Sequence, residues 1–303
     1  GYVFLFIFSL LLLAVFLYFA LYAEIFARKK PLSKQNLFTP FNISLFFINI
    51  SLSMYTICHA IKLRSESKQQ KHTLAFLIDL CQATFDICYL WFSLKRSANQ
   101  LRVLYPSLFP LIQTAFLISP APLLLPALLA LIKIISPSIF LSLSEFFWYQ
   151  CSEILCTVII LAFDGLLITT FIQYLQRTRV SEESVDLKFL IIARFGVVAC
   201  SICGVMILLW VGNIWAYFAM PAGETYATVN AAVTIVYSVC MCLIATVLVG
   251  MKVALHWQRC EEVRTEEKRL SGWNLKREVM RESEATLRIS VETPRASTFG
   301  IDK

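Results

Sequence analysis

Seven long apolar stretches between residues 2 and 255 constrain the fold of this chain more than any other feature. They cover residues 2–27, 37–61, 73–94, 103–136, 145–175, 189–220 and 226–255. A helix that crosses the hydrocarbon core of a bilayer needs about 20 apolar residues, so each stretch is long enough to cross. The composition agrees, because 58% of the residues are apolar and only 16% are charged. We therefore predict an all-α membrane protein built as a seven-transmembrane-helix bundle.

The stretch 103–136 leaves two topologies open, because it contains five prolines. It forms either one kinked helix or a hairpin that breaks near Ser119-Pro120 and adds an eighth span. With seven spans, the loops on the side of the C-terminus hold ten Lys and Arg and the opposite loops hold five. A hairpin changes this ratio to eight against seven. Cytoplasmic loops are enriched in Lys and Arg, so we favour seven spans with the N-terminus outside and the C-terminus cytoplasmic.

Two domains follow from this pattern, a transmembrane domain over residues 1–257 and a cytoplasmic tail over 258–303. The tail holds ten Lys and Arg and nine Asp and Glu, so it lacks the basic excess that nucleic-acid binding requires. Its charge spacing predicts a short helix that ends at Gly272, and we expect disorder beyond Glu284. Cys260 lies just past the last span, where a cysteine is either palmitoylated or a free thiol.

Polar residues inside the apolar stretches are the best candidates for a functional site, because they are costly in a membrane. They recur at helical spacing on one face each of the third and fifth predicted helices, and a further one lies in the sixth. We predict that they line an outer polar cavity for a ligand; the alternative is that they hydrogen-bond neighbouring helices. The candidates are Asp79, Gln82, Asp86, Glu145, Tyr149, Glu153 and Asn213.

Asp164 and Arg194 are a second, separate candidate. They lie at similar predicted depth on consecutive helices. Opposite charges buried in a membrane normally pair with each other, so we predict an intramembrane ion pair between these two side chains.

Cysteine and histidine positions point away from disulfides, metals and cofactors. Eight of the ten cysteines lie well inside apolar stretches and Cys151 lies near the start of one, so a disulfide framework is not expected. Cys200 and Cys203 have the spacing of a redox or metal pair, yet both lie in an apolar helix and are better explained by packing. With Gly196 and Gly204, Cys200 forms a stripe of small residues that is typical of close helix contacts. The three histidines are too scattered for metal ligation, and we expect no enzyme activity.

The span count, the outside N-terminus and the Ser/Thr-bearing tail resemble the architecture of G-protein-coupled receptors. The resemblance is one of topology. The third predicted helix and the start of the basic loop expected over residues 95–102 read Trp91-Phe-Ser-Leu-Lys-Arg96, without the acidic-Arg-aromatic triplet of the rhodopsin-like class. The segment Asn230 to Tyr237 lacks the proline of that class's last helix. Fungal receptors of this architecture also lack these motifs. The resemblance implies a plasma-membrane receptor with membrane lipid, a small ligand or peptide, and a cytoplasmic G protein as partners.

The alternative is a proton- or solute-coupled transporter in which Asp79, Asp86 and Asp164 act as a relay. No internal repeat of the kind that builds many transporters is visible in the sequence, which favours the receptor interpretation.

Overall fold

The computed structural model describes residues 1–20, 39–136, 144–180, 187–219 and 224–291. The chain divides into two compact units, Gly1–Ala254 and Leu255–Lys303, which we describe separately. Within the described ranges, all regular secondary structure is helical.

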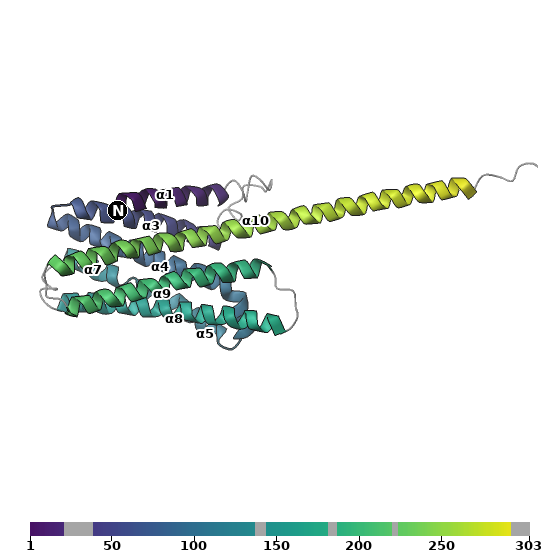
Figure 1. Cartoon of the computed structure of the whole chain (residues 1–303). Helices are drawn as coiled ribbons and strands as arrows, with labels where there is room; N and C mark the ends of the chain where they lie inside the picture. The colour runs from purple at the N-terminus through teal and green to yellow at the C-terminus, as the bar shows by residue number, and fades with distance from the viewer. Residues whose placement is uncertain (21–38, 137–143, 181–186, 220–223, 292–303) are drawn as a thin grey trace, which may run out of the picture. The chain divides into compact units, whose positions relative to one another are not determined.

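The first unit is a bundle of long helices that alternate in direction along the chain (Figure 1). The helices are α1 (Tyr2–Tyr18), α3 (Pro40–Arg64), α4 (Lys68–Leu104), α5 (Phe109–Ile118), α6 (Pro120–Leu123), α7 (Leu125–Ile135), α8 (Ser144–Val180), α9 (Leu187–Ala219) and α10 (Glu224–Val291), the last of which continues into the second unit.

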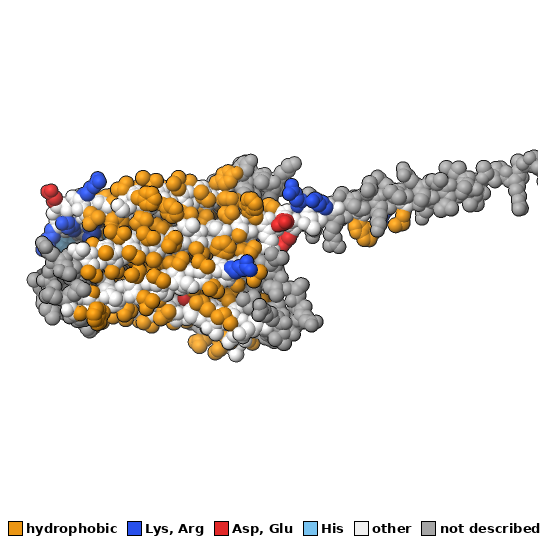
Figure 2. All heavy atoms as spheres, in the orientation of Figure 1, with side chains coloured by type: hydrophobic (Ala, Val, Ile, Leu, Met, Phe, Trp, Pro, Cys, Tyr) orange, Lys and Arg blue, Asp and Glu red, His pale blue; other side chains and the backbone are white. Residues whose placement is uncertain are grey.

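Six helical segments of the described chain are long and apolar enough to cross a membrane, which indicates a multi-pass membrane protein. They are Pro40–Arg64, Lys68–Leu104, Phe109–Ile135, Cys151–Tyr174, Leu190–Ala216 and Thr228–Thr265. The described part of the first apolar stretch forms the shorter apolar helix α1, of 17 residues. Hydrophobic side chains cover most of the visible face of the bundle, whereas Lys and Arg side chains lie mainly toward its ends (Figure 2). Large apolar side chains such as Phe4 and Leu208 are exposed on this bundle, as expected of a surface that contacts lipid.

The boundaries of α3 and α4 follow from local chemistry. Thr39 caps α3, because its Oγ1 accepts a hydrogen bond of 3.2 Å from the backbone N–H of Asn42, and Pro40 occupies the first turn, where a missing N–H costs nothing. At the other end, α4 stops at Leu104 because Pro106 disfavours helical geometry at the residue before it.

The length of α4 corrects one sequence prediction. Residues 95–102 were expected to form a basic loop, but they continue the helix for another two turns. Their inward face is buried and contains Arg96, Ser97 and Gln100. Charged residues at the end of a long helix resemble a loop in the sequence. Only one side of such a helix faces the protein, so its other side can be polar.

The proline-rich stretch 109–135 forms one kinked run, α5–α6–α7, not a hairpin. Backbone hydrogen bonds from Ser119 N to Ala115 O (2.9 Å) and from Leu124 N to Pro120 O (3.0 Å) carry the helix across both breaks. Because prolines have no N–H, some carbonyls lose their helical partner. The Ser119 hydroxyl donates to Phe116 O (2.9 Å), and the Cys156 thiol of α8 donates to Pro122 O (3.4 Å). These side chains compensate for the donors that the prolines remove.

Helices α3 and α4 form the centre of the bundle. Helix α1 packs on α3, while α7 and α8 pack on α4. Leu45, Leu52 and Phe92 are almost completely buried where α3 and α4 contribute to the core, and Met241 is buried on α10. The Lys252 ammonium of α10 donates to the Asn42 side-chain oxygen of α3, which ties the last helix to the bundle.

In the second unit, α10 continues without a break to Val291. The predicted helix end at Gly272 is therefore wrong, since Gly272 lies within the helix. Disorder was predicted from Glu284 onward, but the helix covers this segment up to Val291; residues 292–303 lie outside the described residues.

Candidate functional site

A cavity of about 640 Å³ opens in the first unit at the end of the bundle where α3 is followed by α4. We call this the open end. The walls come from α3, α4, α7, α8, α9 and α10. Five of the seven predicted ligand-binding residues line this cavity together, namely Asp79, Gln82, Tyr149, Glu153 and Asn213. The acidic stripes of the third and fifth predicted helices thus both contribute residues to this cavity.

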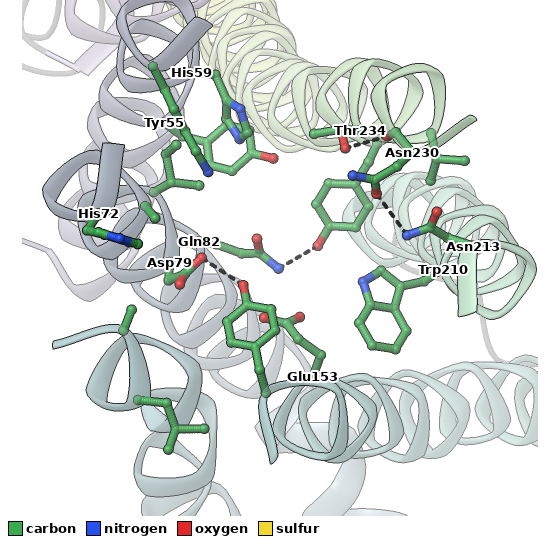
Figure 3. Close-up of a pocket in the computed structure, with 18 of the residues that line it drawn as sticks. Tyr55, His59, His72, Asp79, Gln82, Glu153, Trp210, Asn213, Asn230 and Thr234 are labelled. Carbon is green, nitrogen blue, oxygen red and sulfur yellow. Dashed lines mark hydrogen bonds between the residues drawn. The ribbon is translucent and has the colours of Figure 1, made fainter. Parts of the chain in front are cut away.

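The floor of the cavity is acidic. Asp79 of α4 and Glu153 of α8 are 9% and 7% exposed, and both carboxyl groups point into the space between the helices (Figure 3). The Tyr149 hydroxyl donates to Asp79 Oδ1 over 3.0 Å and so joins α8 to α4. On the other side, Gln82 Nε2 donates to the Tyr237 hydroxyl of α10 over 3.0 Å. Two interhelical hydrogen bonds therefore fix the polar groups of the floor in place.

Aromatic side chains form much of the wall around these carboxyl groups. Tyr55, Trp210 and Tyr237 all line the cavity, together with Tyr149. Tyr55 also packs edge-on against His59, with ring centroids 4.6 Å apart. Aromatic faces beside carboxylates attract organic cations, because both the ring quadrupole and the carboxylate favour positive charge.

The mouth of the cavity has the opposite charge. Lys62 of α3, His72 of α4 and Lys133 of α7 line it at the open end. On the far wall, Asn213 Nδ2 of α9 donates to Asn230 Oδ1 of α10 over 3.1 Å (Figure 3). The cavity is thus polarised, with basic groups at its mouth and acidic groups at its floor.

Asp86, the sixth predicted residue, lies below this floor. It lines a smaller cavity of about 40 Å³ that shares Gln82, Glu153, Trp210 and Tyr237 with the large one. Asp86 is 9% exposed. Among the described residues it has no hydrogen-bond or ion-pair partner.

The predicted ion pair between Asp164 and Arg194 does not form among the described residues, because the Arg194 side chain is exposed. Asp164 is buried, and the Tyr89 hydroxyl donates a bifurcated hydrogen bond to its Oδ1 and Oδ2 atoms, at 3.0 and 3.1 Å. The cation that interacts with Asp164 electrostatically is the buried Arg96. Arg96 was assigned to a loop in sequence, so it was not considered as a partner.

The Arg96 side chain is buried within the bundle, toward the end away from the cavity mouth. Its guanidinium lies 5.3 Å from the ring centroid of Phe171 and 3.8 Å from Met251 Sδ. Its Nε is buried and has no hydrogen-bond partner. A methyl group added at Gly196 would come within 3.0 Å of an Arg96 nitrogen, so Gly196 leaves room for this side chain. The small-residue stripe therefore accommodates a guanidinium at this position.

Two predicted residues stand apart from the cavity. Glu145 falls in α8, but its side chain lies outside the described residues. Cys260 belongs to the second unit, where it is exposed and lies 3.5 Å from His256 Nε2. All ten cysteines are free. The Cys203 thiol donates a hydrogen bond of 3.7 Å to the Tyr89 hydroxyl, and Cys200 Sγ lies 4.0 Å from the same oxygen.

Sequence reasoning missed the aromatic and basic parts of the site. Trp210 and Tyr237 are unremarkable in apolar helices, since aromatic residues are common throughout this chain. Asn230 was not among the predicted ligand-binding residues, although its side chain accepts a hydrogen bond from Asn213 in the cavity wall. The available signal was that Asn230, Thr234 and Tyr237 follow one face of the last helix, as Asp79, Gln82 and Asp86 do on α4.

Comparisons with known proteins identify no relative. None of the protein-family models matches the chain, and neither the curated proteins nor the solved structures contain a significant match. Function must therefore be argued from the cavity itself.

Proposed function

We propose that this protein is a seven-span signalling receptor of the plasma membrane, similar in architecture to G-protein-coupled receptors, with the open end of the cavity facing outside. Six long apolar helical segments and the shorter apolar helix α1 support a count of seven spans. Helix α1 extends about 26 Å over its 17 residues, close to the roughly 30 Å of a hydrocarbon core. In this topology the N-terminus is outside and the tail after residue 257 is cytoplasmic, where a G protein would contact it.

The observation that carries the proposal is a polar cavity that opens at the end of the bundle where α3 is followed by α4. The opposite end of the first unit is filled by buried side chains, among them Leu101, Leu248 and Met251. A cavity that a ligand can enter from one end suits a receptor, in which binding changes the balance between conformations.

The ligand that fits best is a small organic cation. Asp79 and Glu153 provide two buried carboxyl groups at the floor, and a bound ammonium group would neutralise them. Tyr55, Trp210 and Tyr237 provide aromatic faces around that position. The cavity volume of about 640 Å³ lies within the usual range of small-molecule sites.

Thermal unfolding of the purified protein with a panel of biogenic and quaternary amines tests this proposal. A binding amine raises Tm, because it binds the folded protein alone. The variants Asp79→Asn and Glu153→Gln are expected to lose that shift, whereas the exposed control Glu66→Gln keeps it. GTP loading of added G proteins, measured with the stabilising amine, then tests signalling. If no amine stabilises the protein, or if both cavity variants respond like the native protein, the ligand assignment is wrong.

A second candidate function is proton- or solute-coupled transport. A series of buried carboxyl groups favours this function, because it continues below the cavity from Glu153 to Asp86 and then to Asp164. Proteoliposomes separate the two functions. Flux that disappears in Asp79→Asn and Asp86→Asn, without any G-protein activation, would favour the transporter.

A further inference from the structure

We propose that the ligand of the large cavity is zwitterionic, and that Lys62 and Lys133 at the mouth bind its anionic group while the acidic floor holds its amine. The ligand class is then an ω-amino acid, or another small molecule whose amine and carboxylate lie far apart. This assignment rests on the amine site proposed above and names the chemistry of the other half of the ligand.

The mouth of the cavity brings two cations together. Lys62 of α3 and Lys133 of α7 line it from different helices and interact electrostatically with each other. Both side chains are half-buried, so water reaches the ammonium groups and they keep their charge. Two like charges held close together repel each other, and more strongly where the protein excludes part of the water. An anion bound between them would relieve this repulsion.

Lys62 is available for such an anion. Asp79 attracts it electrostatically, but within the described part of the chain the Lys62 ammonium forms neither a hydrogen bond nor an ion pair. The Asp79 carboxyl group instead accepts the hydrogen bond from the Tyr149 hydroxyl at the floor. His72 of α4 lines the same mouth, and an imidazole ring offers a further N–H donor. The mouth thus presents two ammonium groups and one imidazole to an oxyanion.

The position of these lysines in the topology also needs an explanation. Lys and Arg normally concentrate on the cytoplasmic side of a membrane, whereas the mouth of the cavity faces outside in the proposed topology. Lys62 and Lys133 are two of the five Lys and Arg residues on that side, and both line one cavity although 70 residues separate them. Binding of an anionic group accounts for basic residues that are placed there against the usual bias.

The spacing between mouth and floor defines the length of the ligand. On α4, His72 at the mouth precedes Asp79 at the floor by two helical turns, which corresponds to about 10 Å along the axis. On α3, Tyr55 and Lys62 have the same separation. An α-amino acid, whose two charged groups share one carbon, is too short to reach both layers. A longer ω-amino acid spans them, because the flexible Lys62 side chain shortens the gap and Ala75, between the two layers, offers an apolar contact for methylene groups.

Binding of ε-aminocaproate and of its neutral amide, ε-aminocaproamide, tests the anionic subsite, with affinities taken from the dependence of Tm on ligand concentration. The two compounds share the amine and the chain, and only the first has a carboxylate. The native protein is expected to bind the acid about tenfold more tightly, because charge-assisted hydrogen bonds are among the strongest polar contacts. Lys62→Gln and Lys133→Gln are expected to remove this difference and to leave binding of the amide unchanged. Lys71→Gln is the matched control and keeps the difference, since Lys71 is exposed near the start of α4 and does not line the cavity.

Charge reversal separates a binding role of Lys62 from a structural one. Lys62→Glu is expected to bind hexamethylenediamine about tenfold more tightly than ε-aminocaproate, the reverse of the native preference, whereas lost packing alone would weaken both compounds equally. Equal binding of the acid and the amide to the native protein would overturn the anionic subsite and leave the amine site intact, as would a native preference retained in both Lys62→Gln and Lys133→Gln. If neither the acid nor the amide binds, the amine site itself is wrong and the zwitterionic ligand is excluded with it.

Discussion

Replacement of Tyr89 by Phe tests whether the buried carboxyl group of Asp164 depends on a neutral donor and not on Arg194. The Tyr89 hydroxyl is the donor to both Asp164 oxygens, at 3.0 and 3.1 Å, and Tyr89 is only 3% exposed. Removing the hydroxyl leaves the carboxyl group without this bond. Hydrogen bonds between membrane helices contribute about 0.6 kcal/mol on average and up to about 1.7 kcal/mol, and those to charged groups lie at the upper end. We expect Tyr89→Phe to lower the free energy of unfolding by about 1–2 kcal/mol.

A double-mutant cycle in mixed micelles, with unfolding followed by added denaturing detergent, measures this coupling. Tyr89→Phe and Asp164→Ala together are expected to cost about 1–2 kcal/mol less than the sum of the single changes, because both remove the same bond. Arg194→Gln is the control. It is expected to change stability by less than about 0.5 kcal/mol and to be additive with Asp164→Ala, since Arg194 is exposed. Coupling between Asp164 and Arg194 without coupling to Tyr89 would refute the reasoning.

Two further predictions concern packing within the bundle and use the same unfolding assay. Gly196→Ala is expected to lower the free energy of unfolding by about 1 kcal/mol, because its methyl group would meet the Arg96 guanidinium at 3.0 Å. Gly204→Ala, with nothing within 4 Å, is expected to be neutral or to stabilise the protein by up to about 1 kcal/mol through helix propensity. The reverse order of stabilities would contradict the contact between Gly196 and Arg96. Cys156→Ala is expected to lower the free energy of unfolding by about 1 kcal/mol, because the Pro122 carbonyl loses its 3.4 Å donor and Pro126 has no N–H to replace it. Cys156→Ser is expected to retain most of the stability, because its hydroxyl can donate instead. Equal losses in the two variants would indicate that the thiol serves only for packing.

Much of the fold was predictable, because spans are defined by apolar length. Each predicted stretch coincides largely with a helix or kinked run over its described part. The prediction of an all-helical bundle is confirmed for the described residues, and six of its helical segments are long and apolar enough to cross a membrane. The errors lie where helices extend beyond the apolar stretch. Helix α4 includes residues 95–104, and α10 passes through Gly272, because helices continue through polar residues wherever no proline or cap stops them.

The site was predictable only in part. Helical spacing placed Asp79, Gln82 and Asp86 on one face of α4, and the structure brings the first two to the cavity and the third to the space below. Partners across helices were not predictable, since spacing along one helix says nothing about the face that it meets. Depth alone suggested Arg194 for Asp164, but the bundle turns Arg194 outward and places Tyr89 at the carboxyl group.

Cysteine labelling in intact cells tests most directly the central claim, a ligand cavity that faces the outside. In a background with the exposed Cys260 changed to Ser, Ala130→Cys places a thiol in the cavity wall. Ser107→Cys places one in the exposed turn after α4, at the opposite end of the bundle. A membrane-impermeant maleimide is expected to label the Ala130→Cys protein in intact cells and the Ser107→Cys protein only after permeabilisation. Labelling in the opposite order would place the cavity on the cytoplasmic side and contradict the receptor account.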